Sequence, residues 1–274
     1  MSRTERRVRI CQRGCEWNIE RSEDALAFVP QLLCDPMISV IIPVLNEVAL
    51  IGSALETLLR QQGDYEVIVA DGGSRDGTCE VVEKFPVLLV PQPAGAPPGL
   101  GSQINRGAQK ASGVGLVFLH IDVELPPAGI ALIEAALEDP RVIGGGFIPS
   151  YYGPVPASAR LRLAIVERIW KIGTGVPKWF VGDTGPFIRT DVFWRSGGYP
   201  PADFASDWDF GRRLQKLGRL AVIRKPVRVH SRRLVQNGVF KTMLVTLSVA
   251  ILYNLRAERV FLRQWYQQWL PRDR

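Results

Sequence analysis

Residues 114–124, which decide the fold, read Val-Gly-Leu-Val-Phe-Leu-His-Ile-Asp-Val-Glu. The apolar run at their start predicts a strand that is buried on both faces of a sheet. It stops at His120 and Asp122, two side chains that can hold a divalent metal. In open α/β sheets, ligands bind outside the carboxyl ends of the strands. The stretch therefore indicates either a metal site or a plainer arrangement, in which Asp122 caps the next helix and His120 is a satisfied strand-end residue.

Working outward, two more buried strands are expected, at residues 37–44 and 65–70. Pro43 ends the first, because proline has no N–H for the ladder. Segments with helical spacing separate the strands, and this strand–helix repeat predicts right-handed crossovers and a mainly parallel sheet. Parallel strands end at one edge, so the polar residues that follow them should converge there: Asn46, Glu47, Asp71 and Asp122.

The turn after the first strand excludes the usual phosphate-binding loops. Residues 43–47 read Pro-Val-Leu-Asn-Glu, without the glycines of a dinucleotide-binding turn, and no Walker phosphate loop occurs. A diphosphate bound at this edge would therefore need a metal to neutralise it.

Charge is divided unevenly along the 274 residues, whose length fits one large α/β domain or two small ones. Residues 37–150 hold 6 Lys/Arg and 13 Asp/Glu, a net −7, and residues 151–274 hold 22 and 8, a net +14. An acidic half suits a cation, and a basic half suits phosphate or an anionic membrane. The alternative is that the basic half is merely a solvated surface. No nucleic-acid motif occurs, so we expect no nucleic-acid partner.

The four cysteines are too few and too irregular for a disulfide framework. A zinc site at Cys11, Cys15 and Cys34 would lack close pairing and a fourth ligand. We therefore expect reduced thiols in a cytoplasmic protein. The N-terminus has no apolar signal core, and residues 1–36 form an extension of uncertain order.

The second half offers further candidates for the site. Asp183 lies in a glycine-rich loop, where it is either functional or a turn residue. His230 follows a strand-like segment and is either a metal ligand or an ordinary histidine. The neighbouring Arg232 and Arg233 are able to pair with a diphosphate.

The C-terminal region, residues 236–274, is expected to form amphipathic helices. Residues 239–253 are nearly all apolar, but this run of 15 falls short of the ~20 residues that span a bilayer. We favour packing on the domain, with peripheral contact at the inner membrane face as the alternative.

Three motifs together resemble a family 2 glycosyltransferase. They read Ile-Ser-Val-Ile-Ile-Pro-Val-Leu-Asn-Glu at residues 38–47, Val-Ala-Asp-Gly-Gly-Ser-Arg-Asp-Gly-Thr at 69–78 and Phe-Leu-His-Ile-Asp at 118–122. The resemblance covers residues 37–235 and implies an α/β fold of the GT-A type, with a mainly parallel central sheet flanked by helices and with C-terminal helices. Within the family the chain most resembles the bacterial arsenosugar-biosynthesis subgroup, through Gly-Asp-Thr-Gly at residues 182–185 and Ser-Arg-Arg at 231–233.

This resemblance implies a metal-dependent transfer of a sugar from a UDP- or GDP-sugar, with Mg²⁺ or Mn²⁺ bridging the donor diphosphate. The resemblance does not identify the acceptor, for which a lipid-linked molecule and a small molecule both stay open. The implied donor-binding residues are Pro43, Asn46, Glu47, Asp71, Gln103 and Asn105, with Arg232 and Arg233 on the diphosphate. The metal would be held by Asp122 with His120 beside it, and His230 is a further candidate; Gly182 and Asp183 would lie toward the acceptor.

Asp207 matches the family's general base, and a single base without a carboxylate nucleophile suits an inverting displacement. Asp209 is the competing candidate for the general base. The alternative for Asp207 is a structural role, in which its charge in the first turn stabilises the helix dipole. The chain departs from the subgroup at Ser206, where the family has Glu, and at Leu100, where Arg is common. Two other classes stay open: a non-catalytic sugar-nucleotide binder, and a nucleotidyltransferase, which would want a glycine-rich first turn.

Overall fold

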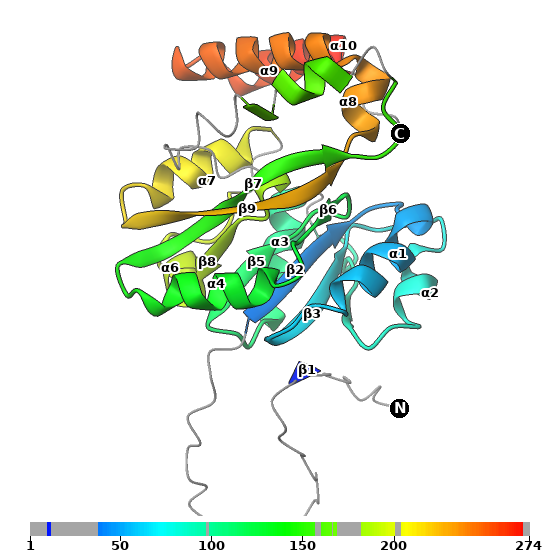
Figure 1. The fold of residues 1–274 in the computed structure, drawn as a ribbon, viewed down its shortest axis with the longest axis vertical. Coiled ribbons are helices and arrows are strands. Elements are labelled where there is room, and N and C mark those ends of the chain that lie inside the picture. Colours follow the sequence, from blue (N-terminus) through cyan, green and yellow to red (C-terminus); the bar gives the residue numbers. More distant parts are fainter. Residues whose placement is uncertain are drawn as a thin grey trace, which may run out of the picture.

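The structure is a computed structural model that describes residues 10–11, 38–96, 99–156, 160–165, 167–168, 182–200 and 204–270. The side chains of Ile10, Cys11 and Arg233 lie outside this description, as does most of the expected extension at residues 1–36. The described strands form one sheet in the order β1-β3-β2-β5-β8-β7-β9-β6, with β4 also paired to β3 (Figure 1).

The first half of the sheet is parallel, as the repeat of strands and helices predicts. Its strands are β2 (Ile38–Val44), β3 (Asp64–Asp71), β4 (Leu88–Val90) and β5 (Gly115–Phe118). Only the two-residue β1 (Ile10–Cys11) runs antiparallel in this part, along the start of β3.

The second half adds antiparallel strands, so the sheet is mixed. β8 (Phe187–Arg189) runs antiparallel to both β5 and β7 (Val142–Tyr152). β9 (Arg219–His230) then runs parallel to β7, and the short β6 (Val123–Glu124) pairs antiparallel with the end of β9. Because β8 runs antiparallel to β5, it begins beside Val117, near the edge where β5 ends.

Two hydrophobic cores lie on opposite faces of the sheet and explain the continuous apolar run before His120. Val117 and Leu119 pack into the core that includes α1 (Val48–Leu58) and α4 (Gly129–Glu138). Leu116 and Phe118 pack into the other core, with side chains of these helices: α3 (Leu100–Lys110), α6 (Thr190–Arg195) and α7 (Ser206–Leu214). Successive strand residues point to opposite faces, so a strand covered on both sides is apolar throughout.

The C-terminal helices α8 (Arg232–Asn237), α9 (Val239–Asn254) and α10 (Arg259–Trp269) lie at one end of the molecule, beyond β7 and β9 (Figure 1). Val245, Val249 and Leu270 are buried together, with Phe204 and Trp208 packed against them. None of the described helices is both long and apolar enough to cross a membrane.

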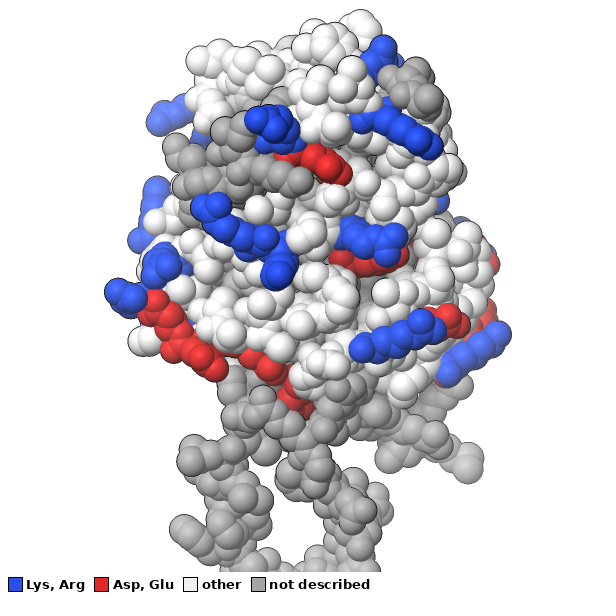
Figure 2. All heavy atoms as spheres, viewed as in Figure 1, with Lys and Arg blue, Asp and Glu red and all other residues white. Residues whose placement is uncertain are grey.

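The short helix α2 (Thr78–Val82) follows Asp76 in the connection between β3 and β4. Residues 160–165 and 167–168 are also helical. On the face drawn in Figure 2, Lys and Arg side chains are spread over the surface rather than gathered into one patch.

Candidate active site

The predicted strand ends meet at one edge of the sheet. Asp71 is the register partner of Val44 at the end of β2, and Ile41 in β2 pairs with Phe118 in β5. The neighbouring ends of β3, β2 and β5 thus bring Asp71, Asn46 and the turn after Phe118 to the same side. This convergence follows directly from the parallel order, and it is the arrangement that the sequence predicts.

Asp71 is only 3% exposed, and its carboxylate organises the turn that follows it. Oδ2 accepts a hydrogen bond from the backbone N–H of Gly73 at 2.7 Å, and both carboxylate oxygens accept from the N–H of Ser74, at 3.2 and 3.1 Å. The charge is therefore fixed at the strand end together with the glycine turn, where a ligand has close access to the backbone.

Asn46 joins the turn after β2 to this glycine turn. Its φ of 55° is left-handed, a conformation that asparagine tolerates better than most residues. Its N–H donates to Ser74 Oγ, and its side-chain Oδ1 accepts from the N–H of Arg75, each at 2.9 Å. Next to it, the Glu47 N–H donates to Thr78 Oγ1, and Pro43 is buried within β2.

Gln103 and Asn105 lie on α3, and their side chains hydrogen-bond to backbone groups. The Gln103 side-chain amide donates to the carbonyls of Val44 and Ala70, at 2.7 and 3.1 Å, and so ties the ends of β2 and β3 together. Asn105 donates to the Tyr199 carbonyl at 2.9 Å and accepts from the Tyr199 N–H at 2.8 Å. Both side chains position backbone near the site, and their contact with a donor stays a prediction.

The turn at residues 120–122 is held against the end of β9. The Val123 N–H donates to the His120 carbonyl at 3.0 Å, which closes the turn. Across β6 and β9, the His230 N–H donates to the Asp122 carbonyl at 2.8 Å, next to the Val123–Val229 pair. Asp122 and His230, 108 residues apart in sequence, are therefore direct neighbours.

The His120 ring packs on the short 3₁₀ helix at Gly182–Thr184. A Cβ built on Gly182 would lie 2.1 Å from His120 Nε2, so only glycine fits against this imidazole. Asp183 follows directly in the same turn. The structure thus brings the two predicted acceptor-side residues to His120.

His230 is surrounded by β7 and by the start of α8. Its Nδ1 accepts a hydrogen bond from the Arg232 N–H at 3.1 Å, and its ring meets that of Tyr152 edge-on, with the centroids 5.2 Å apart. The adjacent Ser231 hydroxyl is fully buried and has no hydrogen-bond partner within the described part of the chain. Arg232 begins a helix and is exposed, and the side chain of Arg233 lies outside the description.

These residues offer a cation an incomplete set of ligands. Among the described residues, no three His, Cys, Asp or Glu side chains form a group that could hold a metal. Asp122, a residue that is 9% exposed, supplies a carboxylate; His120 is near it in sequence, and His230 lies beside it across the strands. Hard cations such as Mg²⁺ bind one or two carboxylates and complete their shell with water and substrate phosphates. The donor set fits that kind of shared site rather than an all-protein site.

Asp207 and Asp209 lie two residues apart on α7 but have different partners. The buried Tyr199 phenol and the Ser206 hydroxyl are hydrogen-bonded to Asp207. Asp209 accepts from the Tyr253 hydroxyl at 2.6 Å and pairs with Arg259. Asp209 thus anchors the C-terminal helices to α7, which leaves Asp207 as the better candidate for proton transfer.

The sequence did not indicate Tyr199 or a cluster beside His230. In that cluster the Tyr152 hydroxyl donates to Glu124, and Arg228 pairs with the other Glu124 oxygen at 3.1 Å. Burial, followed by the hydrogen bond to Glu124, raises the pKa of Tyr152. No local pattern could have found these contacts, because they join β6, β7 and β9.

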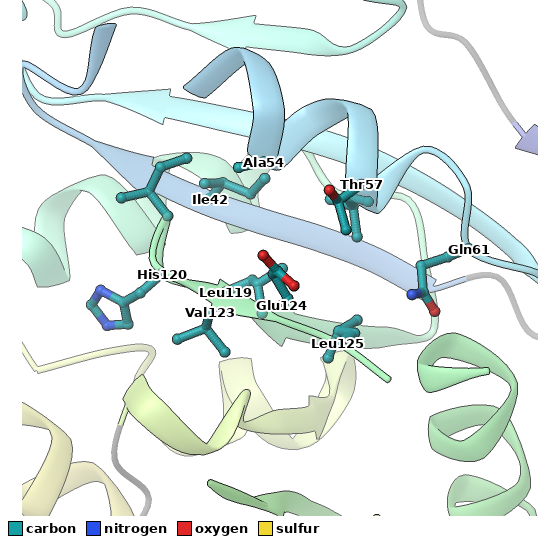
Figure 3. A pocket seen from close by; sticks show the side chains of 11 residues that line it. Ile42, Ala54, Thr57, Gln61, Leu119, His120, Val123, Glu124 and Leu125 are labelled. Atoms are coloured by element: carbon teal, nitrogen blue, oxygen red, sulfur yellow. The ribbon is translucent and has the colours of Figure 1, made fainter. Parts of the chain in front are cut away.

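A small crevice opens beside this turn, between α1 and the segment 119–125 (Figure 3). Its lining is mostly apolar, with Thr57, Gln61 and Glu124 as polar exceptions, and the His120 ring points away from the other side chains (Figure 3). Such a lining does not suit a diphosphate, which needs donors and positive charge.

The sequence itself matches a known family over more than half of its length. Residues 39–194 match Glycosyl transferase family 2. The chain belongs to this family. Its membership agrees with the resemblance drawn from the three motifs, while the arsenosugar subgroup is not confirmed.

Individual relatives share only part of the chain. A PGL/p-HBAD biosynthesis glycosyltransferase of Mycobacterium tuberculosis is 36% identical over 96 residues, which are 33% of this chain and 37% of that protein. The match thus spans little more than a third of the relative's length.

Two solved structures share the fold at low identity. A mannosyltransferase from Pyrobaculum calidifontis, in complex with GDP-Man and Mn²⁺, is 19% identical with a TM-score of 0.60, over 83% of this chain and 66% of that one. Glucosyl-3-phosphoglycerate synthase from Mycobacterium tuberculosis, with Mn²⁺ and UDP, is 20% identical with a TM-score of 0.54, over 81% of each chain. These neighbours confirm the expected GT-A fold.

Proposed function

We propose that this family 2 chain transfers a sugar from a nucleotide-diphosphate sugar to an acceptor hydroxyl, in a metal-dependent reaction that inverts the anomeric carbon. The observation that carries the proposal is the pairing of Asp122 with His230 at the sheet edge where Asp71 also ends its strand. The carboxylates of Asp122 and Asp71 and the imidazoles of His120 and His230 thus belong to one edge of the sheet. Ligands of open α/β sheets bind at this edge.

The donor is a UDP- or GDP-sugar, and the transferred group is a hexose. The fold neighbours described above were solved with GDP-Man and with UDP, which supports this class. Asp71 binds the nucleoside, and Pro43, Asn46 and Glu47 shape the pocket for base and ribose. The glycine turn held by Asp71 lets the donor approach the backbone closely.

Asp122, with His120 and His230, holds the metal together with the donor phosphates. When bound, Mg²⁺ or Mn²⁺ neutralises the charge on the diphosphate leaving group. Arg232 and Arg233 add positive charge from the start of α8, where guanidinium groups suit phosphate oxygens. The subgroup resemblance does not define the substrate further.

Asp207 is the general base. Its carboxylate takes the proton of the acceptor hydroxyl while the acceptor oxygen forms a bond to the anomeric carbon. The bond from that carbon to the diphosphate oxygen breaks on the opposite face, so the configuration inverts. The Tyr199 and Ser206 hydroxyls orient the carboxylate, and Gly182 and Asp183 line the acceptor side. The acceptor is lipid-linked or a small molecule.

The test uses the full chain with a panel of UDP- and GDP-sugars, with and without Mn²⁺ or Mg²⁺. Thermal shift reports donor binding, and release of nucleoside diphosphate reports turnover. Loss of a general base typically costs about 10²–10⁴-fold in rate, so Asp207→Asn should lower kcat by about that factor and leave the donor-induced shift unchanged. Asp122→Asn should raise the metal concentration needed for half-maximal turnover.

Asp209→Asn is the matched control, because it removes a carboxylate from the same helix but from the side that faces Tyr253 and Arg259. It should lower the melting temperature while kcat, measured well below that temperature, stays close to wild type. Unchanged turnover in both Asp122→Asn and Asp207→Asn would contradict the proposal. A donor-induced shift with no turnover by the wild type would favour a non-catalytic sugar-nucleotide binder.

A further inference from the structure

The hairpin of α9 and α10 carries an unusual share of the exposed apolar surface. Fifteen large apolar side chains are exposed in the described part of the chain, and eight of them belong to this hairpin. Surface patches of this kind mark sites of protein or membrane contact. The eight are Phe240, Leu244, Leu247, Ile251, Leu255, Val260, Phe261 and Trp269.

The exposed side chains of α9 form a single stripe. Phe240, Leu244, Leu247 and Ile251 follow one another at intervals of four, three and four residues, which places them on one face of the helix. Leu247 and Ile251 are 54% and 53% exposed, whereas Val245 and Val249 point into the domain and are 7% and 3% exposed. The helix is therefore apolar both toward the protein and away from it.

Aromatic side chains of α10 continue this surface. The Phe261 and Trp265 rings are 6.2 Å apart, and the Trp265 and Trp269 rings 6.1 Å, so the three form a ladder along the helix. Trp265 Nε1 donates to Ser248 Oγ on α9 at 3.0 Å, which places the ladder alongside α9. Tryptophan is enriched where one end of a side chain is apolar and the other is wet, as at a membrane interface.

The charge of the hairpin is positive. Residues 239–270 hold four Lys/Arg and one acidic residue, Glu258, a net +3. Lys241, Arg256 and Arg263 are exposed. At the end of the molecule where the hairpin lies, Figure 2 shows few acidic side chains on the drawn face. An apolar face with a basic rim is the pattern of a helix that lies in the interface of an anionic bilayer.

We propose that the α9–α10 hairpin docks on the surface of an anionic lipid bilayer, with the α9 stripe and the exposed Phe261 and Trp269 inserted below the headgroups and with Trp265 packed on the domain between them. At 16 residues, α9 is too short to span the bilayer and lies in its plane. A second copy of the chain fits less well, because a two-fold interface would bring the same basic rim of both subunits together.

Docking would also orient the candidate active site. Tyr253 of α9 and Arg259 of α10 hold Asp209 on α7, the helix that presents Asp207. Docking would thus fix the position of α7, and with it Asp207, relative to the bilayer. This consequence rests on the proposed role of Asp207, whereas the docking itself is independent of the transferase activity.

Flotation of the full chain with vesicles tests the proposal without any assay of turnover. We expect binding to vesicles of phosphatidylcholine mixed with phosphatidylglycerol, weaker binding to pure phosphatidylcholine, and partial loss of binding in high salt. A double variant, Leu247→Glu with Ile251→Glu, should bind at least about tenfold more weakly, because two large apolar side chains leave the lipid. The control is Val114→Glu, at a site that is 51% exposed but outside the hairpin.

Circular dichroism and the melting temperature establish that the variants are folded. The proposal is overturned if the folded wild type does not float with anionic vesicles, or if the double variant floats as well as the wild type. It is also overturned if sedimentation equilibrium shows a dimer that the double variant abolishes, since the stripe would then be an interface between copies.

Discussion

The buried phenol of Tyr199 is hydrogen-bonded to the carboxylate of Asp207. Burial, and next the charge of Asp207, raises the pKa of Tyr199 well above its ordinary value, so the phenol stays protonated and donates at neutral pH. Asn105 fixes the backbone of Tyr199 through two hydrogen bonds, at 2.9 and 2.8 Å. The proposed base is thus held by a chain of contacts that begins on α3.

Tyr199→Phe should therefore lower kcat by about tenfold, a part of the about 10²–10⁴-fold that a positioned base supplies. The donor KM should change little, because Tyr199 contacts the proposed base, Asp207, and not the residues proposed to bind the donor. Steady-state kinetics at saturating donor measures this separation of kcat from KM.

Tyr65→Phe is the matched control. Tyr65 is also fully buried, and its hydroxyl donates to the Leu58 carbonyl at 3.0 Å, away from the site. This variant should lose about 1 kcal/mol of stability and keep the wild-type kcat. Equal losses of kcat in the two variants would show that the effect at Tyr199 is only structural.

Gln103 is expected to act mainly through the sheet. Gln103→Leu keeps much of the volume but removes the amide that binds the carbonyls of Val44 and Ala70. Losing such a buried hydrogen-bond donor costs about 1–3 kcal/mol, so the melting temperature should fall. We expect the amide to bind these backbone groups and not the donor, so donor affinity should stay within about twofold of wild type. Calorimetry well below the melting temperature measures this affinity. A large loss of donor affinity in a chain of unchanged stability would instead show that Gln103 touches the donor.

The first half of the fold was predictable because its signals are local. Continuous apolar runs mark strands covered on both faces, and the strand–helix repeat then places Asp71 and Asp122 at one edge. Both inferences depend only on periodicity and on the handedness of crossovers. The C-terminal helices were expected as well, from the nearly continuous apolar run at residues 239–253.

The rest of the site depends on contacts between distant segments. The sheet is mixed because of β8, which is only three residues long. A strand this short shows too little alternation of apolar and polar residues to be predicted from the sequence. The choice between Asp207 and Asp209 was open in the sequence, since both lie in the first turn of one helix. The partners of Asp209 are Tyr253 and Arg259, which lie 44 and 50 residues further along the chain.

Asp76 gives stability a defined dependence on pH. Its carboxylate accepts from the N–H of Val48, in the first turn of α1, and from the N–H of Thr78, in the first turn of α2, each at 3.0 Å. The Thr78 hydroxyl is the largest of several hydrogen bonds that lower the pKa of Asp76 from its ordinary 3.8. A lowered pKa stabilises the fold fully above the ordinary value, and this contribution is lost as the pH falls through the folded-state pKa.

Asp76→Asn should therefore lower the melting temperature near pH 7, and its difference from wild type should shrink as the pH approaches 3. Scanning calorimetry over this range measures the difference. Asp191→Asn, at an exposed residue that pairs with Arg195 at 2.8 Å, serves as the control and should change little at any pH. A difference for Asp76→Asn that stays constant with pH would show that the ionised carboxylate is not what joins the two helices.

Gly182 and His120 are expected to be coupled by their close packing. A Cβ at Gly182 would lie 2.1 Å from His120 Nε2 and 2.2 Å from Cδ2, so Gly182→Ala must displace the imidazole. Overpacking of this kind costs about 1–3 kcal/mol, and the melting temperature should fall accordingly. Because His120 belongs to the proposed metal site, the Mn²⁺ concentration for half-maximal turnover should rise as well.

A double-mutant cycle separates the clash from other effects of the alanine. His120→Ala removes the ring, so adding Gly182→Ala to it should cost almost nothing, and the stability effects should be far from additive. Gly52→Ala is the control. Gly52 lies in α1, its added Cβ would meet Val81 of α2 at an ordinary 3.6 Å, and helix propensity predicts a gain of up to about 1 kcal/mol. If Gly182→Ala destabilised the chain as much without the imidazole as with it, the histidine would not be what requires glycine there, and its predicted displacement from the metal site would be wrong.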